Sequence, residues 1–294
     1  MINQIIQDDC LDVLQGIPDK SVDMILCDLP YGTTACKWDT IIPMNDYMEV
    51  LVGKKLKQLN ENEYYLKCYK DGINFKDAQT AWLSEHKKGL WHHYERVIKD
   101  NGAIVLTASQ PFTSLLITSN LSLFKYCWEW EKSKATGFLN SKKRPLVAHE
   151  DVCVFYKVQP NYYPHMTSGS AYDKGVRKKQ TDDDVYGKFE QKQIKSDGLR
   201  YPRSVQYFKT AESEGETFHK TQKPVAMFEY FIRTYTNEGD VVLDNCIGSG
   251  TTAIASLNTG RNFIGIEKDE QYHKIACERV QEWHDEQGLA DKKV

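Results

Sequence analysis

A carboxylate, a proline and a tyrosine stand together directly after the first strongly apolar run of the chain. The run is VDMILC at 22–27, and the tetrapeptide is Asp28-Leu29-Pro30-Tyr31. One interpretation is structural, because a proline turn commonly ends a strand. The other is chemical: a carboxylate and a backbone carbonyl held by a rigid turn can accept both hydrogens of an amine. The tetrapeptide by itself is compatible with both.

Two acceptors on one amine would matter most for an amine attached to an aromatic ring. The lone pair of such an amine is delocalised into the ring, so the nitrogen is a poor nucleophile until the pair is localised on it. In this interpretation Asp28 and the Leu29 carbonyl accept the two hydrogens, while Pro30 keeps the turn rigid. Tyr31 offers a face on which a base extruded from a duplex could stack. The four residues are therefore candidate catalytic residues for a nucleobase amine.

A glycine-containing loop after a second apolar run is a candidate ligand site. Residues 241–243 (VVL) end at Asp244, and the following stretch holds the candidates Gly248, Ser249, Gly250, Thr251 and Thr252. Glycines let a ligand approach the backbone, and a helix N-terminus presents free N–H groups. A tight structural turn would explain the glycines equally well. Glu267 favours a ligand, because an acidic residue at the end of the next apolar run, 263–266, can accept hydrogen bonds from ribose hydroxyls.

The motifs that the sequence lacks narrow the kind of ligand. It contains no G-x-x-x-x-G-K-[ST] pattern for binding phosphates, and the loop lacks the third glycine of a dinucleotide fingerprint. An adenosine ligand without phosphates fits better. The eight cysteines are scattered with no C-x-x-C pair, which argues against a zinc site or a disulfide framework. No metal site is expected.

The elements that must position these residues alternate between strands and helices. Strands are expected at the three apolar runs and also at 103–107 and 151–156, and helices at the alanine-rich stretch closed by Gly260 and at 272–283. This alternation predicts an α/β fold with a doubly wound, Rossmann-like sheet covered by helices on both faces. Loops that bind ligands lie at the carboxyl end of such a sheet.

We expect one α/β domain assembled from three segments, 1–43, 100–157 and 218–294. Residues 44–99 are predicted to be a helical insertion, because apolar residues recur there at roughly helical spacing. Residues 158–217 are rich in Gly, Ser, Tyr, Lys and Asp and show little apolar periodicity. A loop-rich, appended recognition segment is expected there.

Basic residues are concentrated in the middle of the chain, although the formal net charge is −3. Residues 157–209 contain 11 Lys and Arg against six Asp and Glu, and residues 132–144 hold five basic residues and no acidic one. Such runs are often only solvated surfaces. Here they fall between the two candidate sites. The sequence shows no signal-like N-terminus and no apolar run of membrane-spanning length, so we expect a cytoplasmic protein that binds no membrane.

D-x-P-Y followed far downstream by Gly-Ser-Gly-Thr-Thr resembles the amino-methyltransferase family of DNA modification enzymes, which act on N6 of adenine or N4 of cytosine. Because the tetrapeptide precedes the glycine loop, the order resembles the permuted β group of that family. Further matching segments are Asp9-Cys10, HEDVCVFYK at 149–157, His219 to Pro224, and Gly260 to Glu267. Two departures are Leu29, where a proline is commoner, and Asn245-Cys246, where the family usually has Pro-Phe.

The resemblance implies a cofactor, S-adenosylmethionine, and a partner, double-stranded DNA. Its implied cofactor-binding residues are Asp9, Cys10, Asp28, Lys223, Asp244, Gly248, Ser249, Gly250, Thr251, Thr252 and Glu267. The base would be flipped out of the duplex, and its amine would attack the methyl group directly, without a covalent enzyme intermediate. Adenine rather than cytosine is implied by Asp28 alone, so an N4-cytosine enzyme is the alternative.

Other classes fit less well. Protein and RNA methyltransferases with a related turn carry the cofactor loop before the tetrapeptide, and a cytosine-C5 enzyme would need a Pro-Cys pair that this sequence lacks. A DNA-binding protein without activity would not need the intact candidate residues. By resemblance, 158–217 is the target-recognition region. The 44–99 insertion is either a dimer surface or an extra DNA contact, and the resemblance favours a homodimer. No cognate restriction enzyme is predicted.

Overall fold

The computed structural model describes residues 1–34, 36, 39–52, 55–176, 193–213, 215, 217–219 and 221–290. The chain divides into two compact units, one made of Met1–Tyr162 with Val205–Val294 and the other of Tyr163–Ser204. No helix in the described part of the chain is long and apolar enough to cross a membrane.

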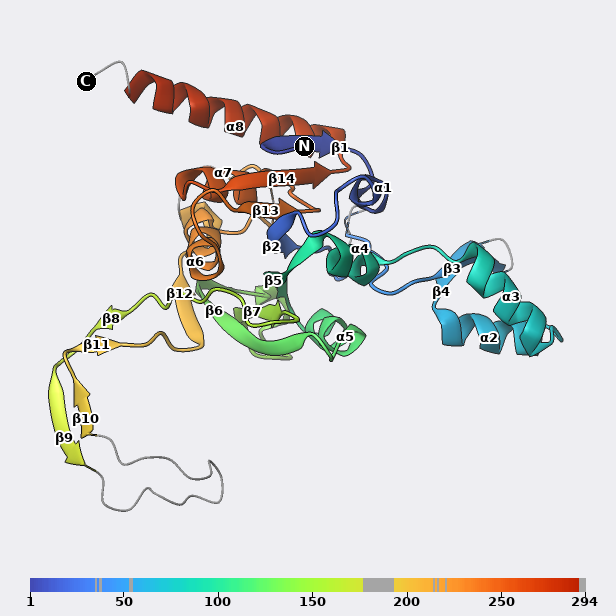
Figure 1. Cartoon of the computed structure of the whole chain (residues 1–294), viewed down its shortest axis with the longest axis horizontal. Coiled ribbons are helices and arrows are strands. Elements are labelled where there is room, and N and C mark those ends of the chain that lie inside the picture. The colour runs from blue at the N-terminus through green and yellow to red at the C-terminus, as the bar shows by residue number, and fades with distance from the viewer. Residues whose placement is uncertain are drawn as a thin grey trace. The chain divides into compact units, whose positions relative to one another are not determined.

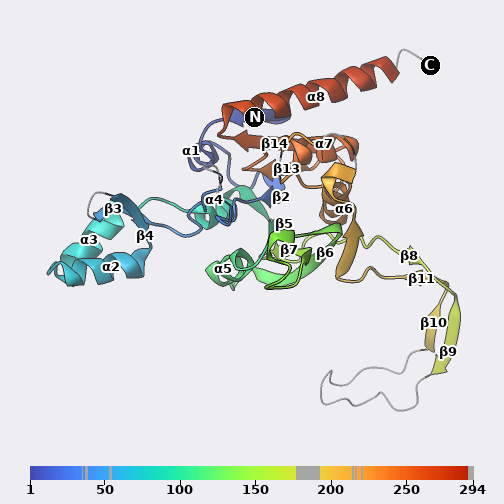
Figure 2. The ribbon, with the colours of Figure 1, turned by 180° about the vertical axis from the view of Figure 1, so that it is seen from behind.

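An eight-stranded sheet forms the centre of the larger unit. Figure 1 shows its strands following one another from β1 through β14, β13 and β2 to β5, β7 and β6, and Figure 2 shows the same succession from behind. Strand β7 is antiparallel to both of its neighbours, and the other pairings are parallel. In sheet order the strands are β1 (Gln4–Gln7), β14 (Asn262–Glu267), β13 (Val241–Asp244), β2 (Val22–Asp28), β5 (Ile98–Ala108), β7 (Val147–Phe155), β6 (Phe124–Thr136) and β12 (Val205–Phe208).

Helices cover both faces of the sheet, because its central strands are apolar on both faces. In β2, Ile25 and Cys27 belong to one hydrophobic cluster while Met24 and Leu26 belong to another. The first cluster includes residues of α1 (Cys10–Gln15), α4 (Leu90–Val97) and α5 (Phe112–Ser119), and the second includes residues of α6 (Val225–Tyr235) and α7 (Thr251–Asn258). Helix α8 (Glu270–Ala290) packs against β1, β14 and α7. The predicted doubly wound α/β fold is confirmed.

The parallel register brings three acidic residues to one edge of the sheet. Asp28 ends β2, Asp244 ends β13 and Glu267 ends β14. Because these strands are neighbours that run in the same direction, their carboxyl ends meet at the edge where α/β proteins bind ligands. Residues about 240 positions apart therefore share one site.

The prediction of helix throughout 44–99 is wrong for its first part. Residues Met48–Val52 and Lys55–Leu59 form an antiparallel hairpin, β3 and β4, and the helices α2 (Glu61–Lys70) and α3 (Phe75–Glu85) follow it. The sequence alternates charged and apolar residues there, as in Lys-Leu-Lys, which suits a strand. The hairpin and both helices share a small core of Met48, Tyr64, Cys68, Ala78 and Trp82. Helix α4 instead packs against the main sheet.

The smaller unit consists of short antiparallel pairs. Strand β8 (Thr167–Ser168) pairs with β11 (Leu199–Arg200), and β9 (Tyr172–Val176) pairs with β10 (Gln193–Ser196). This agrees with the expectation of a loop-rich segment in 158–217. The strand β12 within that range was not predicted, and it adds to the edge of the main sheet beside β6.

Candidate functional site

Both predicted motifs line one cavity of about 1900 Å³ in the larger unit. Its walls include Asp28, Leu29, Pro30 and Tyr31 together with Asp9, Cys10, Lys223, Asp244, Gly248, Ser249, Thr251 and Glu267. Of the residues predicted to form the site, Gly250 and Thr252 do not line the cavity. The structure therefore brings the catalytic candidates and nearly all of the cofactor candidates to one place.

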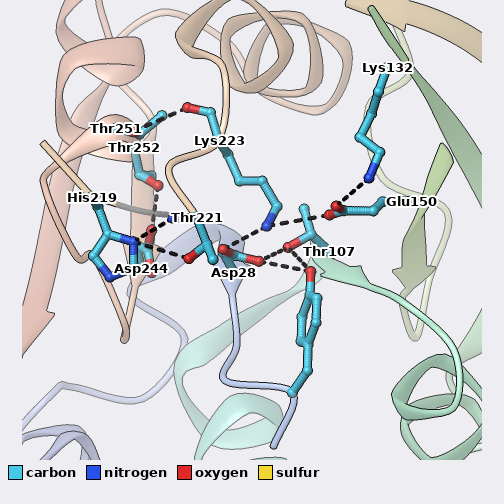
Figure 3. A network of polar contacts seen from close by, with 11 residues as sticks. Asp28, Thr107, Lys132, Glu150, His219, Thr221, Lys223, Asp244, Thr251 and Thr252 are labelled. Atoms are coloured by element: carbon cyan, nitrogen blue, oxygen red, sulfur yellow. Dashed lines mark hydrogen bonds and ion pairs between the residues drawn. The ribbon is translucent and has the colours of Figure 1, made fainter. Parts of the chain in front are cut away.

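Both oxygens of the Asp28 carboxylate have partners. The hydroxyls of Thr107, on the neighbouring strand β5, and of Tyr31 donate to Oδ1, the latter at 2.9 Å. The ammonium group of Lys223, which precedes α6, donates to Oδ2 at 2.8 Å (Figure 3). These three contacts fix the orientation of the carboxylate.

Lys223 lies between two carboxylates. Its Nζ is 2.8 Å from Asp28 and 3.4 Å from Oε2 of Glu150, on β7. Burial alone would lower the pKa of this amine, but the two carboxylates raise it well above its usual range, so the lysine is charged. Lys223, which was predicted to bind the cofactor, thus forms an ion pair with the catalytic candidate Asp28.

Glu150 and Lys132 extend this network to β6. Lys132 Nζ lies 3.1 Å from Oε1 of Glu150, and the lysine side chain is only 3% exposed. The two ammonium groups lower the pKa of the Glu150 carboxyl despite its burial. Figure 3 shows the chain of contacts from Lys132 through Glu150 and Lys223 to Asp28. Neither Glu150 nor Thr107 was predicted as a site residue from the sequence.

The Tyr31 ring is held from several sides. It stacks on Phe112 of α5 with ring centroids 5.2 Å apart and an interplanar angle of 20°. Lys223 Nζ lies 5.3 Å from the ring centroid. Burial and the nearby carboxylates of Asp28 and Glu150 raise the pKa of the phenol well above its ordinary value. Stacking of a base on Tyr31 stays a prediction.

The loop after the tetrapeptide is closed by a buried carboxylate. Asp39 accepts hydrogen bonds from the backbone N–H groups of Gly32, Thr33 and Thr34 at 2.6–2.9 Å. These bonds lower the pKa of Asp39 although its burial opposes this. Asp39 therefore fixes the backbone directly after the tetrapeptide, a role that the sequence analysis missed.

The two loop glycines have different physical roles. Gly248 has a φ of +53°, and a Cβ there would meet no atom within 4 Å, so its backbone faces open space. Its N–H donates to Oε2 of Glu267 at 2.9 Å. Gly250 precedes α7 with a φ of +89°, and a Cβ there would lie 3.1 Å from Cβ of Ala276 in α8. The lack of a side chain leaves the backbone of Gly248 accessible from the cavity, and at Gly250 it allows α7 and α8 to pack together.

Asp244 is a buried carboxyl beneath this loop. It accepts a hydrogen bond from the hydroxyl of Thr252 and another, at 3.0 Å, from the N–H of Cys246. Burial raises its pKa from 3.8 to about 7, although these bonds act in the opposite direction. Thr252 thus contacts the site through Asp244.

The remaining cofactor candidates lie at the other end of the cavity. Asp9 caps α1 by accepting the N–H of Leu11 at 3.0 Å, and it pairs with Lys268 at 2.8 Å. Cys10 is buried as the first residue of α1. Burial raises the pKa of Glu267, which lies one residue before Lys268. In the segment 219–224, Gln222 accepts from the Ser249 hydroxyl at 3.1 Å, and Lys220 lies outside the described residues.

One group of potential metal ligands occurs among the described residues, and none of its members lines the cavity. Glu129, His149 and Asp151, on β6 and β7, bring ligand atoms within 4.8 Å of one another. Desolvation and the neighbouring Asp151 raise the pKa of Glu129 to about 6, and Thr113 donates to Asp151. These contacts already explain the cluster as part of the β6–β7 and α5 packing. The expectation of no metal site stays a prediction.

Comparisons with known proteins identify the family of the chain. A family model described as DNA methylase matches residues 22–278. Type II methyltransferase M.HindIII of Haemophilus influenzae is 23% identical and covers 95% of this chain and 96% of its own length. Type II methyltransferase M.HinfI of the same species is 25% identical over 96% of this chain and 69% of its own length.

Solved structures share the fold. The M1.HpyAVI–SAM complex matches with a TM-score of 0.54 and 22% identity, over 94% of this chain and 98% of that one. PvuII DNA methyltransferase (cytosine-N4-specific) matches with a TM-score of 0.55 and 14% identity, over 93% of this chain and 84% of that one. At these identities the likeness concerns the fold.

Proposed function

Because the chain belongs to the DNA methylase family, we propose that it transfers the methyl group of S-adenosylmethionine to the N6 amine of adenine in double-stranded DNA. The observation that carries this proposal is the Asp28 carboxylate at the wall of the cavity, fixed by Thr107, Tyr31 and Lys223. A carboxylate held in this way is ready to accept an amine hydrogen without reorganising.

The cavity residues fit the cofactor. The open space at Gly248 allows a ligand to approach the backbone, and Glu267 beside it can accept hydrogen bonds from ribose hydroxyls. Asp9 and Cys10 line the same cavity and would adjoin the adenine ring. When bound, S-adenosylmethionine supplies a methyl group on a positively charged sulfur.

The protein's own part in the reaction is positioning and electrostatic stabilisation. Asp28 accepts one hydrogen of the target amine and the carbonyl of Leu29 accepts the other, so the lone pair is localised on nitrogen. Thr107 and Tyr31 hold the carboxylate in place during this step. The amine would take the methyl group directly while the sulfur keeps the electron pair of the broken bond, so no covalent enzyme intermediate is required. The methylated nitrogen would then carry one proton more than the product, and Asp28, which accepts that hydrogen, would receive it.

A cytosine-N4 enzyme is the second candidate. A protein of that specificity shares the fold, and the two amines have the same chemistry. Adenine is favoured by the aspartate at position 28, because the family tendency pairs Asp with adenine and Ser with N4 of cytosine.

Contacts to DNA are proposed for the basic segments. Of the five basic residues in 132–144, Lys132 is buried against Glu150 and the exposed Lys134 pairs with Glu212 at 3.3 Å. Lys142, Lys143 and Arg144 are exposed and could approach phosphates. The 163–204 unit lies within the region proposed for target recognition, and its described residues include Lys174, Lys195, Arg200 and Arg203. Their side chains would contact phosphates or base edges.

The test is methyl transfer from labelled S-adenosylmethionine to DNA of mixed sequence, followed by mass spectrometry of the nucleosides. We expect N6-methyladenine. Detection of N4-methylcytosine in place of N6-methyladenine would support the second candidate, a cytosine-N4 enzyme. Label found in RNA or protein but not in DNA would overturn it.

A further inference from the structure

We propose that Glu150 is a positioning residue that shares Lys223 with Asp28 and thereby keeps Asp28 available to the amine of the target base. Lys132 completes the arrangement by balancing the charge of Glu150. This inference rests on the proposed function, and it assigns a role in the reaction to two residues outside the tetrapeptide and the cofactor loop.

The first observation is that Lys223 has two carboxylates within reach. Its Nζ lies 2.8 Å from Oδ2 of Asp28 and 3.4 Å from Oε2 of Glu150, and its side chain is 7% exposed. In this arrangement the lysine bonds more closely to Asp28 than to Glu150. An incoming amine must share Oδ2 of Asp28 with Lys223 or replace it.

The second observation is that Lys223 holds Glu150 only loosely. The buried Oε2 of Glu150 forms an ion pair with Lys223 at 3.4 Å but accepts no hydrogen bond from the described residues, whereas Oε1 accepts from Lys132 at 3.1 Å. A buried acceptor without a good hydrogen bond is costly, so a short movement of the Lys223 ammonium toward Glu150 would be favourable. That movement would release the Asp28 oxygen when the amine arrives.

The third observation concerns charge. Asp28 and Glu150 carry two negative charges, and Lys223 and Lys132 carry two positive ones, so the buried network is balanced. Positive charge develops on the amine nitrogen during methyl transfer. An unbalanced lysine beside it would oppose the reaction strongly, because charges interact strongly where water is excluded. The negative charge of Glu150 balances that of Lys223 and so removes this electrostatic repulsion.

The test compares single-turnover methylation rates of the full-length protein. Glu150→Gln keeps the shape of the side chain but leaves an excess positive charge, and we expect a rate about tenfold to a hundredfold lower, as is typical when a supporting residue around a site is lost. Affinity for S-adenosylmethionine, measured by calorimetry, and the KM for DNA should stay within about twofold. Glu129→Gln is the matched control, because Glu129 lies on β6 and contacts neither lysine.

Two further variants separate charge balance from a merely structural role. Lys132→Met leaves an excess negative charge, which does not oppose the positive charge that develops on the amine, and it should slow the reaction by less than tenfold. The double variant Glu150→Gln/Lys132→Met restores the balance and should react faster than Glu150→Gln alone. A structural role predicts the opposite order, with the double variant slowest.

The outcomes are distinguishable. A folded Glu150→Gln variant that methylates at the wild-type rate overturns the inference while the proposed function stands. If Glu150→Gln does not fold, as judged by thermal melting, Lys132→Met decides: a folded variant slower than wild type by more than tenfold overturns the inference. A wild-type protein that methylates no DNA overturns the proposed function itself.

Discussion

Three carboxyl groups of the site show how environment separates residues of the same chemistry. Asp28 is fixed by two hydroxyls and an ammonium group, which suits an acceptor of amine hydrogens. Asp244 is buried, and its burial raises its pKa to about 7 although the hydroxyl of Thr252 and the N–H of Cys246 donate to it. Burial also raises the pKa of Glu267, although the N–H groups of Gly248 and Asp269 oppose this.

The raised pKa of Asp244 predicts a pH dependence of stability. Between pH 3.8, where the group ionises in the unfolded chain, and about 7, where it ionises in the folded protein, the folded state binds more protons. The free energy of unfolding contributed by this group therefore falls as pH rises through that window and then levels off. Urea unfolding at pH 5 and pH 8 should show a smaller difference for Asp244→Asn than for wild type.

The control for this prediction is Asp285→Asn, on an exposed part of α8. It should leave the wild-type difference between the two pH values unchanged. Equal pH dependence in Asp244→Asn and wild type would show that the group is not protonated in the folded protein at neutral pH.

At the scale of elements, the strands that form continuous apolar runs could be predicted from the sequence. The runs that became β2, β13 and β14 are apolar apart from Asp23 because both faces of the sheet are covered. The hairpin β3–β4 was misjudged because leucines and tyrosines at nearly helical spacing concealed the alternation of a strand. Strand β6 was also missed, although its buried Trp128 and Trp130 alternate with charged residues as in a strand with one covered face.

The site was predictable only where its residues form contiguous motifs. Asp28 to Tyr31 and the 244–252 loop stand together in the sequence. Glu150 gains its role from Lys223 and Lys132, which are distant in sequence and meet it only when β6, β7 and the segment before α6 pack together. Thr107 is a similar case, since only the register of β5 against β2 places it beside Asp28.

Helix packing at the cofactor loop gives a prediction for Gly250. Alanine there must adopt a φ of +89°, and its Cβ would lie 3.1 Å from Cβ of Ala276. Gly250→Ala should therefore lower the free energy of unfolding by about 1–3 kcal/mol, as measured by urea denaturation. Gly288→Ala, in the exposed part of α8 with no atom near its Cβ, is the matched control and should be neutral or slightly stabilising. A Gly250→Ala protein as stable as wild type would contradict this account of the loop.

At the scale of the whole molecule, the hairpin and helices of 48–85 present apolar side chains to solvent. Leu66 and Tyr69 of α2 and Phe75 and Leu83 of α3 are all exposed. Exposed apolar residues gathered on one small element are typical of interaction surfaces. This supports the proposal that the insertion is the dimer surface rather than an extra DNA contact, since a DNA contact would need an excess of basic side chains and residues 48–85 hold six Lys against six Asp and Glu.

Light scattering tests the proposed homodimer. Wild type should have the mass of two chains, and the combined variant Leu66→Gln/Tyr69→Gln/Leu83→Gln should have the mass of one. The control variant Leu115→Gln/Leu121→Gln removes exposed leucines at α5 and beyond its end, and should remain dimeric. A monomeric wild type, or a triple variant that stays dimeric, would count against the proposal.

The central claim is that Asp28 receives the target amine, and one comparison tests it most directly. Asp28→Ala leaves Lys223 with Glu150 as its partner, so the protein should fold and bind S-adenosylmethionine as the wild type does. Formation of N6-methyladenine in DNA should fall by at least about a hundredfold, because a preorganised acceptor at the reacting nitrogen is lost. Methylation by Asp28→Ala at the wild-type rate, with cofactor binding intact, would contradict the account.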